Sequence, residues 1–159
     1  MPSPRRSATV TRVLRVPAEQ VWDVVTDVRN HTRWVPMTRI DAAGDLRVGD
    51  RFEAVTGPFA TTGAPGLADR MVIERLDPPS TDAARSGVAV YRKLGPVLLG
   101  TAEVHVRPLG PEHCALTWVE DVHLRGLPAG ATAGVLRPVL GTMLRAVLAR
   151  ASAELRAAT

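Results

Sequence analysis

The sequence predicts an α+β fold in which a curved antiparallel sheet of seven strands wraps around a long carboxy-terminal helix. Three observations lead to this prediction. Two short helices follow the first strand, six further strands come one after another with short turns between most of them, and the chain from Val135 onward has a helical hydrophobic period. With 159 residues the chain has the length of one domain, so we expect residues 1–159 to form a single unit.

The first strand is expected at residues 7–16, and two helices at residues 17–35. Pro17 suits the first turn of a helix, because the N–H that it lacks would have no partner there. Apolar residues then recur at helical spacing from Val21 to Val28. The pattern breaks at Arg29–Asn30, and it restarts as a single turn that ends before Pro36.

The rest of the sheet follows from short apolar segments bounded by Gly, Pro and Asp. Further strands are expected at residues 37–43, 51–57, 69–76, 88–94, 97–107 and 113–124. Residues 57–66 form a long loop rich in Gly, Pro and Thr, and loops of this length often serve as lids. In the last segment, Pro138 is expected either to bend the helix or to mark its start.

Composition limits the function. The net charge is +4, and nineteen of the twenty cationic residues are arginines spread along the chain, which is unlike the one-sided basic surface of a nucleic-acid-binding protein. The single cysteine, Cys114, allows neither a disulfide within the chain nor a thiolate metal site. The amino-terminal residues MPSPRRSATV lack an apolar core segment, so we expect no signal peptide, and the sequence has no uninterrupted apolar run of about 18 residues. We expect a cytoplasmic protein without metal, cofactor, nucleic-acid partner or membrane span, either as a monomer or as a homodimer.

The segment from Pro17 to Pro36 resembles the opening of the START-like helix-grip superfamily (SRPBCC), in its bacterial polyketide cyclase/dehydrase and lipid-transport branch. The matching positions are Pro17, Val21, Trp22, Asp27, Trp34 and Pro36, followed in order by Val48–Phe52, Asp77–Pro79, Gly95, Gly100 and Leu116–Trp118. The resemblance covers nearly the whole chain. It implies a helix-grip fold with an apolar cavity between the sheet and the long helix, which holds a hydrophobic small molecule such as a lipid, an aromatic compound or a polyketide.

The alternation along the seventh strand brings one acid into that cavity. One face carries Leu116, Trp118 and Glu120, and the other carries Asp121; the first face is more apolar, so we point it inward. The opposite register would bring Asp121 inward instead. A carboxyl group in an apolar pocket has a raised pKa, which suits a general acid or base. Alternatively, the acid lies near the open end and pairs with Arg92 or Arg70.

The predicted site therefore has two groups of residues. The candidates for proton transfer are Glu120, Tyr91, Asp69 and His31, and Tyr91 is expected opposite Gly100 across a Gly95–Pro96 turn. The candidates for ligand contact are Trp34, Phe52, Met71, Trp118, Leu136, Leu140 and Met143.

The expected function is binding of a hydrophobic small molecule, with metal-free cyclisation or dehydration by acid–base chemistry. Two alternatives stay open: a non-catalytic carrier or sensor for a lipid or isoprenoid, and an interaction module that holds no ligand. Polar groups that converge inside the cavity would favour catalysis, and a wholly apolar lining would favour a carrier. A cavity below about 300 Å³ would favour the interaction module.

Overall fold

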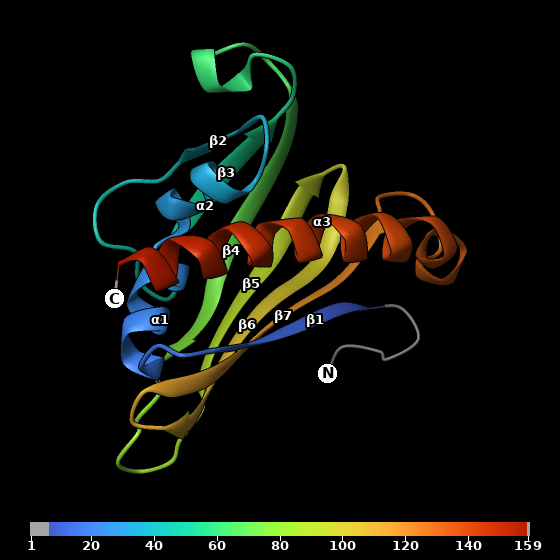
Figure 1. The fold of residues 1–159 in the computed structure, drawn as a ribbon. Coiled ribbons are helices and arrows are strands. Elements are labelled where there is room, and N and C mark those ends of the chain that lie inside the picture. Colours follow the sequence, from blue (N-terminus) through green and yellow to red (C-terminus); the bar gives the residue numbers. More distant parts are fainter. Residues whose placement is uncertain (1–6, 159) are drawn as a thin grey trace.

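The computed structural model describes residues 7–158 and confirms the predicted fold class (Figure 1). The elements follow in the predicted order: β1 (Ala8–Leu14), α1 (Ala18–Thr26), η1 (Val28–Asn30), α2 (His31–Trp34), β2 (Thr38–Asp41), β3 (Arg51–Thr56), η2 (Ala60–Thr62), β4 (Leu67–Asp77), β5 (Gly87–Pro96), β6 (Leu98–Gly110), β7 (His113–Leu124) and α3 (Ala129–Ala157).

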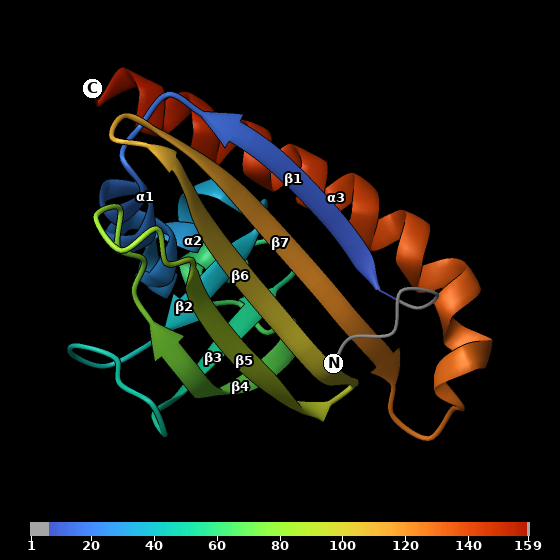
Figure 2. The same cartoon turned by 90° about the horizontal axis from the view of Figure 1, so that it is seen from below.

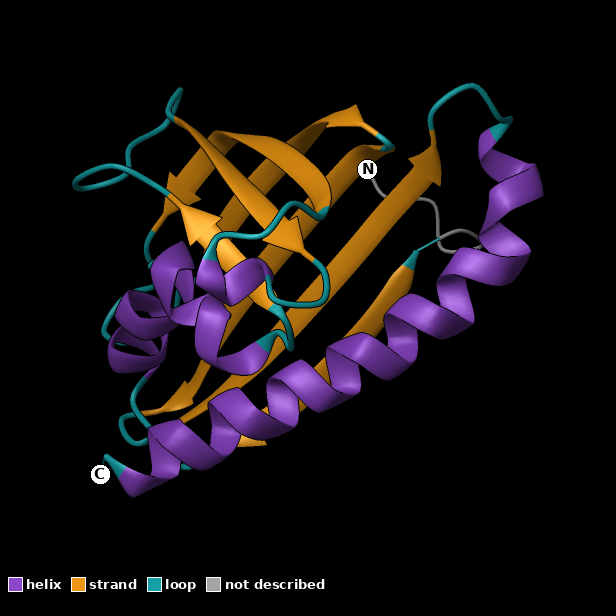
Figure 3. Cartoon of the chain, turned by 90° about the horizontal axis from the view of Figure 1, so that it is seen from above, coloured by secondary structure: helices purple, strands orange, loops and turns teal. Residues whose placement is uncertain are grey.

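All seven strands join one antiparallel sheet in the order β1-β7-β6-β5-β4-β3-β2. The first strand therefore pairs with the last one, while α1, η1 and α2 connect β1 to the opposite edge. The sheet is strongly curved, and α3 runs beside β1 (Figure 2). Figure 3 shows α3 crossing one side of the sheet, with the short helices next to its carboxy-terminal half. The hydrophobic core therefore lies between the sheet and the helices.

The long helix starts earlier than the sequence suggested. It begins at Ala129 and includes Pro138, so this proline does not mark its start. The helix bends in its first part (Figure 3), and of its residues before Leu144 only Thr132 is buried. By length and mean hydropathy α3 could cross a membrane, a test that core helices of soluble proteins also pass. The apolar side chains of α3 are therefore buried mainly in the second half of the helix.

The turn between β5 and β6 differs from the prediction by one residue. Tyr91 lies opposite Ala102, and the partner of Gly100 is Lys93, so the expected pairing of Tyr91 with Gly100 is wrong. Strand β5 continues through Pro96, which moves the reversal to Pro96–Val97. Because Lys93 follows Tyr91 by two residues, both side chains lie on the inner face of the sheet, and the observed register places Lys93 opposite Gly100.

Gly100 of β6 is a strand glycine whose conformation the fold requires. Its φ is +124°, and a Cβ atom would lie 2.1 Å from the backbone oxygen of Asp121. We expect Gly100→Ala to lower the free energy of unfolding by at least about 2 kcal/mol, from backbone strain and overpacking. Urea unfolding measures the change. Gly110→Ala, where a Cβ meets nothing within 4 Å, is the control and should change stability by less than about 0.5 kcal/mol.

Candidate functional site

A cavity of about 260 Å³ lies between the inner face of the sheet and the second half of α3. Its helix wall is formed by Leu140, Met143, Leu144 and Val147. Its other walls come from the sheet and the short helices, with Val28, His31, Val35, Thr38, Ile40, Phe52, Ala54, Thr56, Leu67, Asp69, Met71, Tyr91, Lys93, Leu98, Ala102, Trp118 and Glu120. Leu67 is 45% exposed, and every other lining residue is buried or partly buried.

The fold brings the four proton-transfer candidates together, since Glu120, Tyr91, Asp69 and His31 all line the cavity. Glu120 is the inward acid of β7, and Asp121 lies on the other face, opposite Thr101. Five candidates for ligand contact also line the cavity, namely Phe52, Met71, Trp118, Leu140 and Met143. The other two, Trp34 and Leu136, lie outside it.

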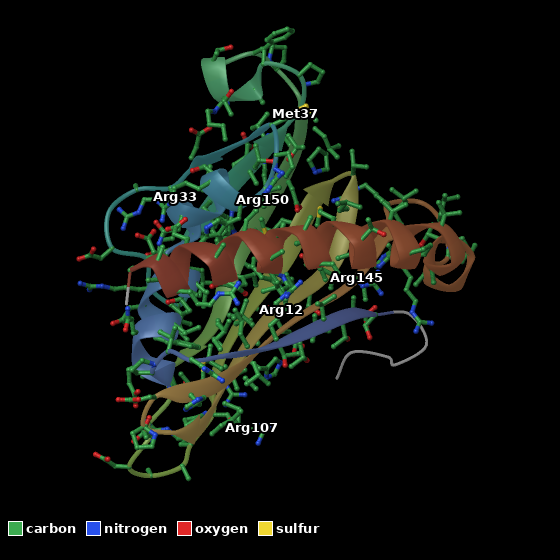
Figure 4. All side chains as sticks on the ribbon, in the orientation of Figure 1. Arg12, Arg33, Met37, Arg107, Arg145 and Arg150 are labelled. Atoms are coloured by element: carbon green, nitrogen blue, oxygen red, sulfur yellow. The ribbon has the colours of Figure 1, made fainter. Side chains whose placement is uncertain are left out.

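Trp34 joins the short helices to α3 instead of facing the cavity. It is almost fully buried, and its indole N–H donates a hydrogen bond of 2.8 Å to Glu154. Arg33 pairs with the same carboxylate, and Arg150 of α3 donates to the backbone oxygen of Trp34 at 2.9 Å (Figure 4). Leu136 is one helical turn before Leu140, in the part of α3 that buries few residues.

The structure adds a residue that the sequence prediction missed. Lys93 of β5 is buried beside the two acids, with its Nζ 2.5 Å from Asp69 Oδ2 and 3.6 Å from Glu120 Oε2. We call these three residues the buried charge cluster. A signal was available: Lys93 is the single lysine of the chain, and it continues the inward alternation of Ala89 and Tyr91. The expected arginine partners lie elsewhere, since Arg92 pairs with Glu74 and Arg70 with Glu53.

The buried charge cluster contains one cation for two carboxyl groups. Burial alone would lower the pKa of Lys93, but the charges of Glu120 and Asp69 raise it, so the ammonium group persists. Burial raises the pKa of Glu120, and the neighbouring Asp69 adds to this effect while Lys93 opposes it. The raised pKa makes the Glu120 carboxyl group a candidate proton donor.

Four buried polar atoms around the cluster have no hydrogen-bond partner among the described residues. They are Asp69 Oδ1, Tyr91 OH, Trp118 Nε1 and Glu120 Oε2, and all four residues line the cavity. Glu120 Oε2 nevertheless lies 3.6 Å from Lys93 Nζ, and the Trp118 side chain is near enough to the Glu120 carboxyl group to lower its pKa, so Asp69 Oδ1 and Tyr91 OH are the atoms that a ligand would satisfy first. Burial raises the pKa of the Tyr91 hydroxyl, so this group stays a neutral donor. Unpartnered buried polar atoms are rare in native proteins and each costs free energy. The cavity therefore has an apolar helix wall and one polar wall ready for hydrogen bonds.

His31 is fixed as a neutral side chain. Its Nε2 donates to the backbone oxygen of Val25 at 2.8 Å, which leaves Nδ1 as the acceptor. The ring lies 5.0 Å from that of Trp118 and 5.5 Å from that of Trp34. Burial lowers its pKa to about 4, although the Val25 carbonyl and the charge of Asp27 oppose the shift. His31 is thus uncharged at neutral pH.

This burial makes folding depend on pH. The unfolded chain binds a proton at His31 near pH 6.5, whereas the folded chain does so only near pH 4. Stability is therefore lost as the pH falls through this window, by up to about 3 kcal/mol. We expect His31→Gln, which keeps a donor for Val25, to lose less stability than the wild type between these pH values. Urea unfolding across this range tests this, with the exposed His113→Gln as the control, which should follow the wild type.

A second hollow lies on the other side of the sheet. It is an open groove of about 1440 Å³ between the outer face of β5, β6 and β7 and the first half of α3. It contains charged side chains such as Glu103, Arg137 and Arg145, and it contains none of the predicted site residues. Within residues 7–158 no three His, Cys, Asp or Glu side chains are grouped to hold a metal ion. The polar side chains that could act together on a ligand therefore line the smaller cavity.

Comparison with solved structures supports the fold. A START superfamily protein from Mycobacterium smegmatis superimposes with a TM-score of 0.71 at 12% identity, covering 96% of this chain and 99% of the other. The Zhui aromatase/cyclase from Streptomyces sp. R1128 gives 0.59 at 25% identity, covering 96% and 90%. The di-domain ARO/CYC BexL from the BE-7585A biosynthetic pathway gives 0.65 at 19% identity, covering 95% of this chain and 46% of the larger protein.

No curated protein matches the sequence. A family match, however, extends over residues 5–156, which is almost the entire chain. It agrees with the resemblance of the segment Pro17–Pro36. The chain belongs to the family described as polyketide cyclase/dehydrase and lipid transport.

Proposed function

We propose that this protein binds an uncharged or weakly polar hydrophobic small molecule in the cavity between the sheet and α3, and that it promotes loss of water from it by acid–base chemistry. The observation that carries the proposal is the polar wall. Asp69, Tyr91, Trp118 and Glu120 line a cavity whose opposite wall is formed by Leu140, Met143 and Leu144, and each of the four carries a buried polar atom without a hydrogen-bond partner. The similarity to an aromatase/cyclase at 25% identity is consistent with this chemistry.

The groups of the polar wall can be assigned to the steps of a dehydration. In a β-hydroxy ketone, Glu120 would give its proton to the departing hydroxyl, so that the C–O bond breaks and water leaves. Asp69 would accept the proton of the neighbouring carbon through Oδ1 as the C=C bond forms. Tyr91 would donate to the ketone oxygen. Lys93 contacts both acids, so the proton taken by Asp69 has a short path back to Glu120.

Size limits the ligand. At about 260 Å³ the cavity lies just below the 300 Å³ that separates a usual ligand site from a collapsed core. An apolar cavity of about 150 Å³ binds benzene, so a ligand of one or two rings fits here. Burying a lysine, two acids and a tyrosine around a cavity costs free energy, and a core that holds no ligand gains nothing in return. These residues therefore favour ligand binding over the interaction module.

Native mass spectrometry of freshly purified protein tests the binding part of the proposal. We expect a population heavier than the chain by the mass of a small organic molecule, and we expect that population to disappear on mild denaturation. Lys93→Met, which disrupts the polar wall, should carry less of the ligand than a surface control such as Arg92→Met. Protein that is always free of ligand, and that binds no one- or two-ring compound when these are added, would favour the interaction module.

A further inference from the structure

We infer that the cavity selects uncharged ligands that carry a hydroxyl group, and that it excludes both the matching carboxylates and the matching hydrocarbons. This inference rests on the proposed ligand-binding function. It names the class of ligand from the arrangement of Asp69, Lys93 and Glu120 around the cavity, together with Tyr91 and Trp118.

The first argument is the balance of charge. Lys93 is the only lysine or arginine among the residues that line the cavity, and both Asp69 and Glu120 lie within 4 Å of it. With Glu120 protonated, the buried charge cluster is neutral, and with Glu120 ionised it is negative. In neither state is a cation free to pair with an anion. A ligand carboxylate would therefore be buried beside Asp69 without compensation, which opposes binding strongly.

The second argument is the set of unpartnered atoms. Asp69 Oδ1 can only accept a hydrogen bond when ionised, whereas Tyr91 OH, a neutral hydroxyl, is free to donate one. A ligand hydroxyl is both donor and acceptor, so it can satisfy a member of each kind at once. A hydrocarbon of the same shape leaves all these atoms without partners, and it gains only from the apolar wall.

The three compounds naphthalene, naphthol and naphthoate share one ring system and differ in these properties. All are small enough for a two-ring site, naphthol is uncharged at neutral pH, and naphthoate is an anion. Equilibrium dialysis at pH 7 against the purified chain gives the three dissociation constants. We expect naphthol to bind at least about tenfold more tightly than either of the others, the effect of an unsatisfied or wrongly charged buried group.

Variants of the acids test whether charge is the cause. In Asp69→Asn with Glu120→Gln, Lys93 keeps no carboxylate partner, and the preference should reverse toward naphthoate. Asp69→Asn alone is the matched control, because Glu120 can still neutralise Lys93, and it should continue to exclude naphthoate. Circular dichroism shows whether each variant is folded. If a variant is unfolded, the comparison of the three compounds on the wild-type protein still tests the inference.

The outcomes separate this inference from the function on which it rests. Naphthoate or naphthalene binding the wild type as tightly as naphthol would overturn the selection for uncharged hydroxylated ligands, while leaving ligand binding in place. A double variant that folds and still prefers naphthol would overturn the role of the buried charge cluster. If none of the three compounds binds protein free of other ligands, the ligand-binding function itself fails.

Discussion

Lys93→Met is expected to destabilise the protein by about 3–5 kcal/mol, the cost of breaking a buried ion pair from one side. The lysine side chain is 6% exposed, and those of Asp69 and Glu120 are 15% and 7% exposed. Methionine fills a similar volume but leaves two acids buried without a cation. For a domain of this length the melting temperature should fall by roughly 10 °C. Thermal and urea unfolding at pH 7 measure the change.

Two controls identify the cause. Arg92→Met changes the adjacent residue, whose half-exposed side chain pairs with Glu74, and it should cost less than about 1 kcal/mol. Adding Asp69→Asn and Glu120→Gln to Lys93→Met removes the uncompensated charges, so most of the lost stability should return. If Lys93→Met is as stable as Arg92→Met, the three residues do not form a charge cluster in solution.

Glu120→Gln is expected to lower the rate of dehydration at least about a hundredfold, because glutamine cannot give a proton to the departing hydroxyl. A suitable test compound is the aldol adduct of benzaldehyde and acetone. It has one ring, carries a hydroxyl and a ketone, and forms benzalacetone on loss of water. The conjugated product absorbs in the near ultraviolet, so absorbance gives the rate directly.

The loss of rate should not come from unfolding. Because the pKa of Glu120 is raised in the folded chain, its burial makes folding less favourable above the ordinary carboxyl pKa of 4.5, where the unfolded chain has released this proton. This costs stability at neutral pH, and glutamine removes the cost, so the variant should be at least as stable as the wild type. Asp121→Asn, on the other face of β7, is the matched control and should keep the wild-type rate. A wild type that does not accelerate the reaction would favour a carrier over an enzyme.

Much of the fold could be predicted because it depends on local patterns. The alternation of β7 identified the inward acid, and its bounds, His113–Leu124, are those expected from the sequence. The helical period identified α3, but Ala129–Gly134 offers few large apolar residues, so the true start was missed. A pattern of apolar residues detects the buried half of a helix better than the half that buries little.

The site was predicted less completely, because one of its central residues was not considered. Four acid–base candidates do line one cavity, since each lies on the apolar face of its own element. Alternation along β5 places Lys93 on the same face as Tyr91, but a lysine is rarely buried without a charged partner, and its partners Asp69 and Glu120 come from other strands. Trp34 was expected at the ligand, but its hydrogen bond to Glu154 on α3 comes from a contact between distant segments that no local pattern reveals.

The methionines offer the most direct test of the central claim, that a small molecule binds between the sheet and α3. Met71 of β4 and Met143 of α3 line the cavity from opposite sides. Met37, labelled in Figure 4, is 57% exposed and is not one of the residues that line the cavity. Labelling the methyl groups of the four methionines therefore gives two reporters and an internal control, beside the signal of Met1.

The measurement is a methyl NMR titration of the labelled protein with naphthol. The aromatic ring of a bound ligand should shift the signals of Met71 and Met143 together and to saturation, while the signal of Met37 stays in place. Unchanged signals for Met71 and Met143 at saturating naphthol, or a shift confined to Met37, would contradict a ligand site between the sheet and the helix.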